Sequence, residues 1–215
     1  MLAGKPLIAW SIEQALAVER VSRLIVSTDC EKIAAVSRNY GAHVPFMRPD
    51  QLAHDQSPEW LSWRHALSWL QEHEGVLPDV MLSVPATAPL RIPEDIDRCL
   101  DEYYKGDVDA VVTISEANRN PYFNMVMKNS DNSIRLVIPP SHALSRRQDS
   151  PPVFDMATVA YVIRSSFILE KSSLFEGRLR GVCVPRYRAV DIDSLLDFQI
   201  SELLMKKRVY GDAIH

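Results

Sequence analysis

Residues 181–197 read GVCVPRYRAVDIDSLLD and combine a strand pattern, an acidic loop and a helix start. The run 181–184 is short and apolar, which is typical of a buried strand. Ser194 and Asp197 have the S-x-x-D spacing of a helix start signal. A strand that leads through a loop into a helix is the repeating unit of an α/β fold, so this stretch predicts that fold class.

The acidic loop contains two aspartates, Asp191 and Asp193, separated by one residue. If the segment is extended, their side chains face the same way, because side chains along a strand alternate. Two carboxylates on one face repel each other, and a hard cation such as Mg²⁺ relieves the repulsion and prefers oxygen ligands. Alternatively, Asp193 or Ser194 caps the following helix and one aspartate is a solvated loop residue. The two residues by themselves leave both interpretations open.

The rest of the chain repeats the alternation of strands and helices. Apolar runs predict strands at 24–27, 44–46, 79–84, 110–114, 158–163 and 180–185. Start signals and apolar spacing predict helices that begin at Pro6, Glu31, Ser57, Pro93 and Ser194. This pattern predicts an α/β fold with a mostly parallel sheet covered by helices on both faces. The first helix has no strand or phosphate-binding turn before it, as such folds usually have.

Between residues 116 and 152 the alternation stops. Two extended runs, 122–128 and 133–137, are joined by Asn-Ser-Asp-Asn at 129–132, which predicts a β-hairpin. We therefore expect 116–152 to form an arm inserted into a single domain that spans 1–215. Such an arm commonly serves as a dimer contact or as a lid.

Composition excludes several function classes. The net charge is −4 and the pI is about 5.9, whereas a nucleic-acid surface would be basic. The three cysteines, Cys30, Cys99 and Cys183, are far apart and suggest neither a disulfide framework nor a metal site, so a reducing, cytoplasmic compartment is expected. There is no apolar run long enough to span a bilayer, so no membrane partner is expected.

Several short motifs occur in a recognisable order. They are LAGKPLI at 2–8, IVSTD at 25–29, FMRP at 46–49, HAL at 65–67, TAPLR at 87–91, NPY at 120–122, RQ at 147–148 and VDID at 190–193. Together they resemble the acylneuraminate cytidylyltransferase family, the CMP-sialic acid synthetases, almost from end to end. The resemblance implies a three-layer, Rossmann-like fold of the nucleotide-diphospho-sugar transferase type. It also implies a reaction in which the anomeric hydroxyl of a keto-acid sugar attacks the α-phosphorus of CTP, giving a CMP-sugar and pyrophosphate.

The resemblance assigns roles on the nucleotide side of the site. Asp191 and Asp193 match the family's catalytic, magnesium-binding positions, and one of them is expected to help deprotonate the sugar hydroxyl. Arg48 and Thr87 match nucleotide-binding positions. From the residues alone, Arg48 is equally well explained as a surface residue before a proline turn. Arg91 is expected to be solvated near a helix start.

Other residues are expected to bind the sugar. Arg146, Arg147 and Gln148 are the candidates for the sugar carboxylate, because a guanidinium fork matches a planar carboxylate. The alternative for the arginines is a solvated basic pair on the arm. Asn124 and Tyr161 are expected to hydrogen-bond the sugar's hydroxyl or acyl groups, although Tyr161 is also explained as a packing residue. The resemblance further implies a homodimer whose arms exchange, so that Arg146 or Arg147 approaches the partner's site.

The sequence departs from the family pattern in two places. The family's leading strand and its arginine-, serine- and lysine-containing phosphate loop have no counterpart, and we expect the true start to lie upstream of Met1. Without that strand, two neighbouring strands would be unpaired. In addition, residues 155–158 read DMAT and residues 85–88 read PATA, and both runs differ from the family's usual substrate-recognition motifs. The runs at 155–158 and 118–124 resemble the branch that activates legionaminic or related diamino nonulosonic acids.

These observations predict a CTP- and Mg²⁺-dependent cytidylyltransferase for a nonulosonic acid. One alternative is a nucleotidyltransferase that acts on another keto-acid sugar, such as an octulosonate. The other is a catalytically impaired or dead paralogue that binds a sugar nucleotide, which the absent phosphate loop would favour.

Overall fold

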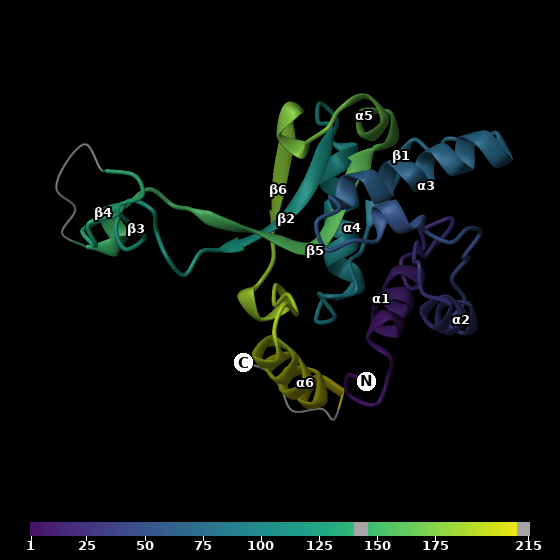
Figure 1. Cartoon of the computed structure of the whole chain (residues 1–215), viewed down its shortest axis with the longest axis horizontal. Helices are drawn as coiled ribbons and strands as arrows, with labels where there is room; N and C mark the ends of the chain where they lie inside the picture. The colour runs from purple at the N-terminus through teal and green to yellow at the C-terminus, as the bar shows by residue number, and fades with distance from the viewer. Residues whose placement is uncertain (140–145, 210–215) are drawn as a thin grey trace.

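The computed structural model describes residues 1–139 and 146–209 (Figure 1). Its helices are α1 (Leu7–Leu16), α2 (Glu31–Asn39), α3 (Glu59–Glu74), α4 (Pro93–Tyr104), α5 (Ser165–Glu170) and α6 (Leu195–Val209). Its strands are β1 (Val80–Ser83), β2 (Ala110–Glu116), β3 (Val126–Lys128), β4 (Ile134–Leu136), β5 (Phe154–Arg164) and β6 (Leu179–Cys183). Short 3₁₀ helices lie at Asp50–Leu52 (η1), Arg147–Asp149 (η2), Leu174–Glu176 (η3) and Arg186–Arg188 (η4).

The central sheet has the strand order β1-β5-β2-β6. Strand β5 is antiparallel to both β1 and β2, and β2 is parallel to β6. Three strands therefore share one direction and β5 alone runs against them, so the sheet is mixed and two of its three pairings are antiparallel. The predicted α/β fold class is confirmed, but the mostly parallel pairing is not. Sequence could not reveal this reversal, because a central strand is apolar on both faces whichever way it runs.

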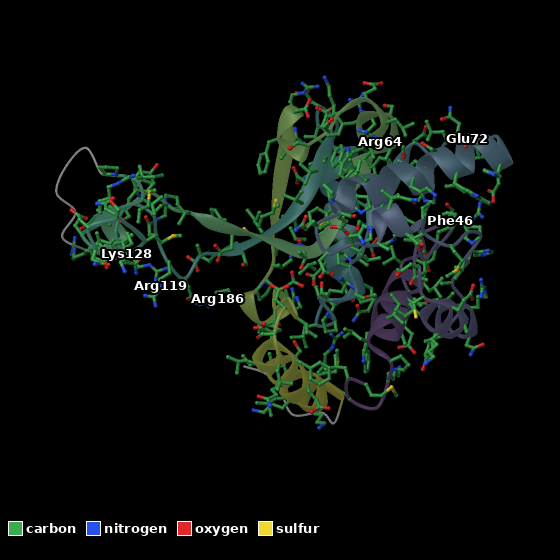
Figure 2. The ribbon with its side chains drawn as sticks, viewed as in Figure 1. Phe46, Arg64, Glu72, Arg119, Lys128 and Arg186 are labelled. Carbon is green, nitrogen blue, oxygen red and sulfur yellow. The ribbon has the colours of Figure 1, made fainter. Side chains whose placement is uncertain are left out.

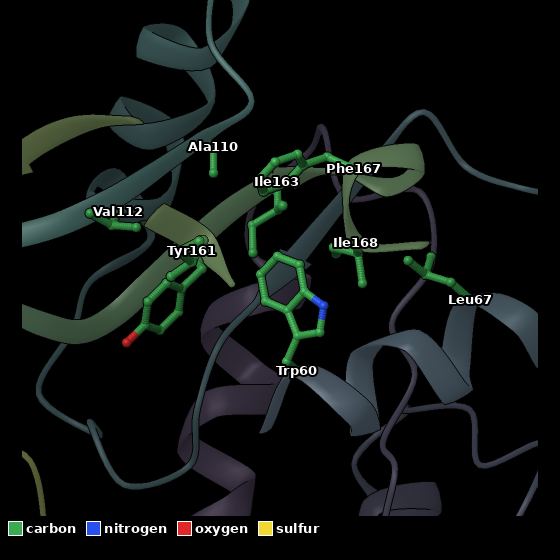
Figure 3. Packing of buried hydrophobic residues seen from close by; sticks show 9 residues of the cluster. Trp60, Leu67, Ala110, Val112, Tyr161, Ile163, Phe167 and Ile168 are labelled. Carbon is green, nitrogen blue, oxygen red and sulfur yellow. The ribbon is translucent and has the colours of Figure 1, made fainter. Parts of the chain in front are cut away.

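Alternate residues of β2 and β5 pack on opposite faces of the sheet. On one face, Ala110 and Ile163 join a cluster with Trp60 of α3 and Phe167 of α5 (Figure 3). On the other face, the strand residues Val111, Ala160 and Val162 pack against Ile96, Cys99 and Leu100 of α4. The two clusters make three layers, as expected for this fold class. The apolar stripes predicted for α3 and α4 are confirmed.

Two predicted strands are absent from the described residues. The segment at 24–27 contributes one isolated parallel bridge, between Ile25 and His43, and the segment at 44–46 contributes none. Both segments are apolar, as a strand would be. A strand also needs a neighbouring strand along its length, and neither segment joins the central sheet. Strand β1 likewise has only β5 as a neighbour, so its other edge is unpaired among the described residues.

The helices begin within one or two residues of their predicted starts. Helix α2 is followed by Gly41 with a φ of 92°, a left-handed conformation that glycine adopts without strain. Helix α3 begins at Glu59, and Ser57 donates its hydroxyl to the Gln51 carbonyl instead of capping the helix. Helix α5 was not predicted, because it is only six residues long. None of the described helices combines the length and the apolar character needed to cross a membrane.

The predicted arm is confirmed. Strands β2 and β5 stay paired as far as Glu116 and Phe154, and the chain between them projects far from the body (Figure 1). Within the arm, β3 and β4 form an antiparallel hairpin whose turn contains Asn132 with a φ of 68°. The hairpin carries exposed apolar side chains, among them Met127 and Ile134.

Candidate active site

A cleft of about 1090 Å³ opens at the carboxyl end of β1. Its polar wall includes Ser27, Arg48, Glu59, Ser83, Thr87 and Asp191. The 24–27 segment and the unpaired strand β1 both line this cleft. Ligands of α/β proteins collect at the carboxyl ends of strands, and this cleft gathers charged groups from four separate stretches of the chain.

Arg48 is fixed to one wall of the cleft. Its Nε donates a 3.1 Å hydrogen bond to Ser27 Oγ, and another guanidinium nitrogen donates to the Ser27 carbonyl. Its backbone N–H donates to the Thr28 carbonyl at 2.8 Å. These bonds hold a permanent positive charge beside the cleft, which suits an anionic ligand. Arg48 is half-buried and directly precedes Pro49, so both of its interpretations stay open and its role in nucleotide binding stays a prediction.

Asp191 lies where this cleft meets a second, smaller cavity. The second cavity has a volume of about 310 Å³ and includes Met156, Thr158 and Arg186 in its wall. Asp191 lines both cavities, and the next residue, Ile192, donates its N–H to the Thr87 carbonyl at 2.9 Å. Predicted residues Arg48, Thr87 and Asp191 are thus brought together, and the DMAT run at 155–158 borders the adjoining cavity.

The surroundings of Asp191 fit a hard cation. Its Oδ1 atom is buried and has no hydrogen-bond partner. A buried carboxylate oxygen without a donor is costly, and a divalent cation would satisfy it. Among the described residues there is no group of three or more His, Cys, Asp or Glu side chains placed to hold a metal. Any metal bound here would therefore need further ligands from substrate phosphates and water.

Asp193 is placed differently from Asp191. It is exposed, lies at a bend and lines neither cavity. The bend leads into a reciprocal cap, in which Asp197 accepts hydrogen bonds from the Ser194 N–H and hydroxyl at 2.9 and 2.6 Å. These bonds lower the pKa of Asp197. The cap is therefore made by Ser194 and Asp197, and a metal-binding role for Asp193 stays a prediction.

Glu59 is a third carboxylate in the cleft, and sequence reasoning missed it. Ser83 Oγ lies 3.4 Å from Glu59 Oε1 and donates to it. Burial of its carboxyl group raises the pKa of Glu59, and the charge of Asp191 adds to this effect, while Arg48 opposes it. Its position directly after Ser57-Pro58, at the start of α3, was the available signal, but only the fold shows that the helix start faces β1.

Tyr161 belongs to the hydrophobic core. It is 5% exposed and lies in the cluster with Trp60 and Ile163 (Figure 3). Its ring centroid lies 5.6 Å from that of Trp63. Burial raises the pKa of Tyr161 to about 12, with smaller contributions from Glu59 and Asp191. The phenol therefore stays protonated. Packing explains this residue fully, and its contact with a sugar stays a prediction.

The residues expected to grip the sugar carboxylate lie on the arm. Arg146 pairs with Asp149 at 3.1 Å, and Arg147 donates to the Ala117 carbonyl at 2.6 Å. Gln148 is exposed, and Asn124 Oδ1 accepts from the Asn120 N–H at 2.7 Å. The arm residues Arg119 and Lys128 lie well away from Phe46 on the body in Figure 2. None of these four arm residues lines either cavity of its own chain.

Arg91 corrects a prediction. It was expected to be solvated, but it is fully buried. Its guanidinium donates to the Val159 carbonyl and to Ser11 Oγ, both at 2.7 Å, and also to the Pro85 carbonyl. Burial lowers the pKa of Arg91 to about 9. The residue ties α1, β5 and the loop after β1 together, a role that only long-range contacts could reveal.

Solved structures with a similar fold are nucleotidyltransferases. A CMP:2-keto-3-deoxy-manno-octonic acid synthetase complexed with CTP matches with a TM-score of 0.66 and 16% identity, covering 97% of this chain and 90% of that one. A 4-diphosphocytidyl-2C-methyl-D-erythritol synthase from Anaerococcus prevotii matches with a TM-score of 0.67 and 13% identity, over 96% and 88% of the two chains. The fold is therefore that of α/β nucleotidyltransferases.

Sequence comparison identifies the family. The cytidylyltransferase family model matches residues 1–200, so the chain belongs to the cytidylyltransferase family. A CMP-N,N'-diacetyllegionaminic acid synthase from Campylobacter jejuni is 34% identical over 200 residues, which cover 93% of this chain and 83% of the relative. The post-translational flagellin modification protein B of Campylobacter coli is 32% identical over 203 residues, covering 94% and 85%. The resemblance found in the motifs is thus confirmed.

Proposed function

We propose that this protein transfers a cytidylyl group from CTP to a nonulosonic acid, releasing pyrophosphate. The observation that carries the proposal is the cleft at the end of β1, where Arg48, Thr87 and Asp191 meet in a member of the cytidylyltransferase family. Arg48 supplies a fixed positive charge for the nucleotide, and the Thr87 loop supports the segment that contains Asp191.

The chain's own residues explain why a cation is needed. Asp191 and Glu59 both direct negative charge into the cleft that would receive a triphosphate, and Arg48 offsets only part of it. We propose that Asp191 holds Mg²⁺ through its unpartnered Oδ1, with Asp193 as a second ligand. When bound, Mg²⁺ acts as a Lewis acid that neutralises and orients the phosphates. A carboxylate beside the attacking sugar hydroxyl can also accept its proton.

We place the sugar in the smaller cavity next to Asp191. Its wall includes Met156 and Ala157, which present a less polar surface than a fully hydroxylated sugar would favour. Relatives named CMP-N,N'-diacetyllegionaminic acid synthase occur in Campylobacter jejuni and in Legionella pneumophila, the latter 30% identical over 207 residues. We therefore propose legionaminic acid or a related diacylamino nonulosonic acid as the acceptor.

We further propose a homodimer in which the arm reaches the partner's cleft. The segment 117–152 contains five Lys or Arg and two Asp or Glu, whereas the whole chain has 24 and 28. The arm is thus positive and the body negative, so an arm is electrostatically complementary to another copy's body. We also propose a cytoplasmic location, which the three free cysteines support because free thiols are typical of a reducing compartment.

Pyrophosphate release tests the reaction and its substrate. The protein is incubated with CTP, Mg²⁺ and a panel of nonulosonic and octulosonic acids. We expect formation of CMP-sugar that depends on Mg²⁺ and is fastest with N,N'-diacetyllegionaminic acid. A clear preference for N-acetylneuraminate or for an octulosonate would reject the proposed acceptor. No turnover with any sugar would reject the proposed activity of this chain.

Mixing two impaired variants, at a sugar concentration below the wild-type KM, tests the arm exchange. Asp191→Asn removes the cleft carboxylate, and Arg147→Ala removes the arm guanidinium. In a mixed dimer with exchanged arms, one site has both defects and the other has none. Random re-pairing should therefore restore about a quarter of the wild-type activity. If each arm served its own chain, every site would keep one defect and mixing would restore nothing.

A further inference from the structure

The segment that carries Asp191 belongs to no regular element. It lies between η4, which ends at Arg188, and α6, which begins at Leu195. A carboxylate on an irregular segment is only as well placed as the contacts that flank it. One flanking contact is the hydrogen bond from the Ile192 N–H to the Thr87 carbonyl.

The other flanking contact is a buried ion pair between Arg188 and Asp95. Arg188 Nε lies 3.0 Å from Asp95 Oδ2, and a terminal guanidinium nitrogen donates to Asp95 Oδ1 at 3.0 Å. The two side chains are only 15% and 1% exposed, and the other ion pairs found in the described part of the chain are all more exposed. Asp95 Oδ2 also accepts from the Ile92 N–H at 3.1 Å, at the start of α4.

These contacts close a ring that includes Thr87 and Asp191, which both line the cleft. From Thr87 the chain runs to Arg91, which is anchored on the Pro85 carbonyl and on Val159. Ile92 and Asp95 follow at once and lead through the ion pair to Arg188. Asp191 follows three residues after Arg188. The N–H of the next residue, Ile192, donates to the Thr87 carbonyl and closes the ring. Cutting the ring at the ion pair would leave Asp191 held from one side.

Stability alone does not explain a buried ion pair. Desolvating two charges costs about as much as their attraction returns, so such pairs contribute little net stability compared with neutral or apolar replacements. What this pair does provide is a fixed position for Arg188, through one charge-assisted hydrogen bond and a second close contact of opposite charges in a buried place. We propose that Asp95 and Arg188 are positioning residues that set the location of Asp191 for the metal-bound nucleotide. This inference rests on the proposed function.

The experiment compares two matched double variants of the full chain. Asp95→Asn with Arg188→Gln removes both charges but leaves an oxygen acceptor for the Ile92 N–H. The control is Asp109→Asn with Arg164→Gln, at the other end of the sheet. Asp109 likewise pairs with an arginine and accepts from a backbone N–H, that of Arg178 at 2.8 Å. Thermal unfolding establishes that both variants are folded.

Two readouts decide the proposal. Amide hydrogen exchange at Ile192 should accelerate at least tenfold in the Asp95/Arg188 variant and not in the control. Calorimetric titration with CTP and Mn²⁺ should show roughly 10- to 100-fold weaker binding in that variant only, the range typical of residues that orient metal ligands.

The opposing outcomes are distinct. Unchanged Ile192 exchange and CTP binding in a folded Asp95/Arg188 variant overturns the positioning role. An equal acceleration at Val162, in the middle of β5, assigns the effect to global stability and overturns it as well. If the wild-type chain does not bind CTP with Mn²⁺, the proposed function fails, and the Ile192 exchange still shows whether the ion pair holds the segment.

Discussion

The body of the molecule and the arm at 117–152 differ in burial and in charge. The body encloses two apolar clusters on the two faces of one sheet and has an excess of acidic residues. The arm exposes apolar side chains on a two-stranded hairpin and has an excess of basic residues. An isolated hairpin is at best marginally stable in water, so the arm is expected to gain stability from a second surface. The body holds the cleft, and the arm holds the arginines that are predicted to bind the sugar carboxylate.

The largest effect should separate the two regions by stability. Phe167→Ala removes a ring that is 2% exposed in the body's core, and should lower the free energy of unfolding by about 3–5 kcal/mol. Ile134→Ala changes an arm residue that is 64% exposed, and should cost less than about 0.5 kcal/mol at concentrations where the chain is monomeric. Urea denaturation of both variants measures the difference. Similar losses would contradict the distinction between the regions.

A nearly equal effect is expected on catalysis. Asp191→Asn removes the negative charge of a carboxylate that lines the cleft, and losing several kcal/mol of charge stabilisation should lower kcat/KM roughly 10²–10³-fold. The matched control is Asp193→Asn, which should lose less, since Asp193 lines neither cavity. Steady-state pyrophosphate release compares them. A larger loss at Asp193 would show that the bend at this residue rearranges when substrates bind.

Effects of intermediate size are expected on the KM values of the two substrates, with the arm binding the sugar acid and the body binding CTP. A hydrogen bond to a charged group contributes about 1.5–3 kcal/mol, so Arg147→Ala on the arm should raise the KM for the sugar acid roughly 10- to 100-fold. Arg48→Ala in the body should raise the KM for CTP by a similar factor. Each variant should leave the other substrate's KM near the wild-type value. A change in both constants from either substitution would mean that the two regions do not divide the substrates.

The smallest effect concerns Glu59 and pH. The pKa of this carboxyl is raised above its ordinary value of 4.5, mainly by burial, so the ionised form is disfavoured in the folded protein. Below pH 4.5 the carboxyl is protonated in both the folded and the unfolded protein, and its burial carries no charge penalty. As the pH rises through the raised pKa, the folded protein must bury a charged carboxylate, and its free energy of unfolding falls. Glu59→Gln should therefore melt at a higher temperature than wild type at pH 7 and at the same temperature at low pH. A gain that does not depend on pH would contradict this assignment.

The sequence by itself determined much of this protein. Apolar period and helix start signals located α3, α4, α6, β1, β2 and the arm, because these signals act over a few residues. The motifs indicated Arg48, Thr87 and Asp191, and the structure brings these three to one cleft. The local S-x-x-D signal also identified the cap of α6, which Ser194 and Asp197 form. Asp191 takes no part in this cap.

Only the tertiary structure decided how these pieces face one another. The reversal of β5, the burial of Arg91, the entry of Glu59 into the cleft and the ring through Asp95 and Arg188 all depend on residues far apart in the chain. The apolar run at 24–27 became no regular strand, because pairing is a property of two segments and composition describes one. Local patterns are set by neighbours in sequence, whereas burial, pairing and pKa shifts are set by neighbours in space.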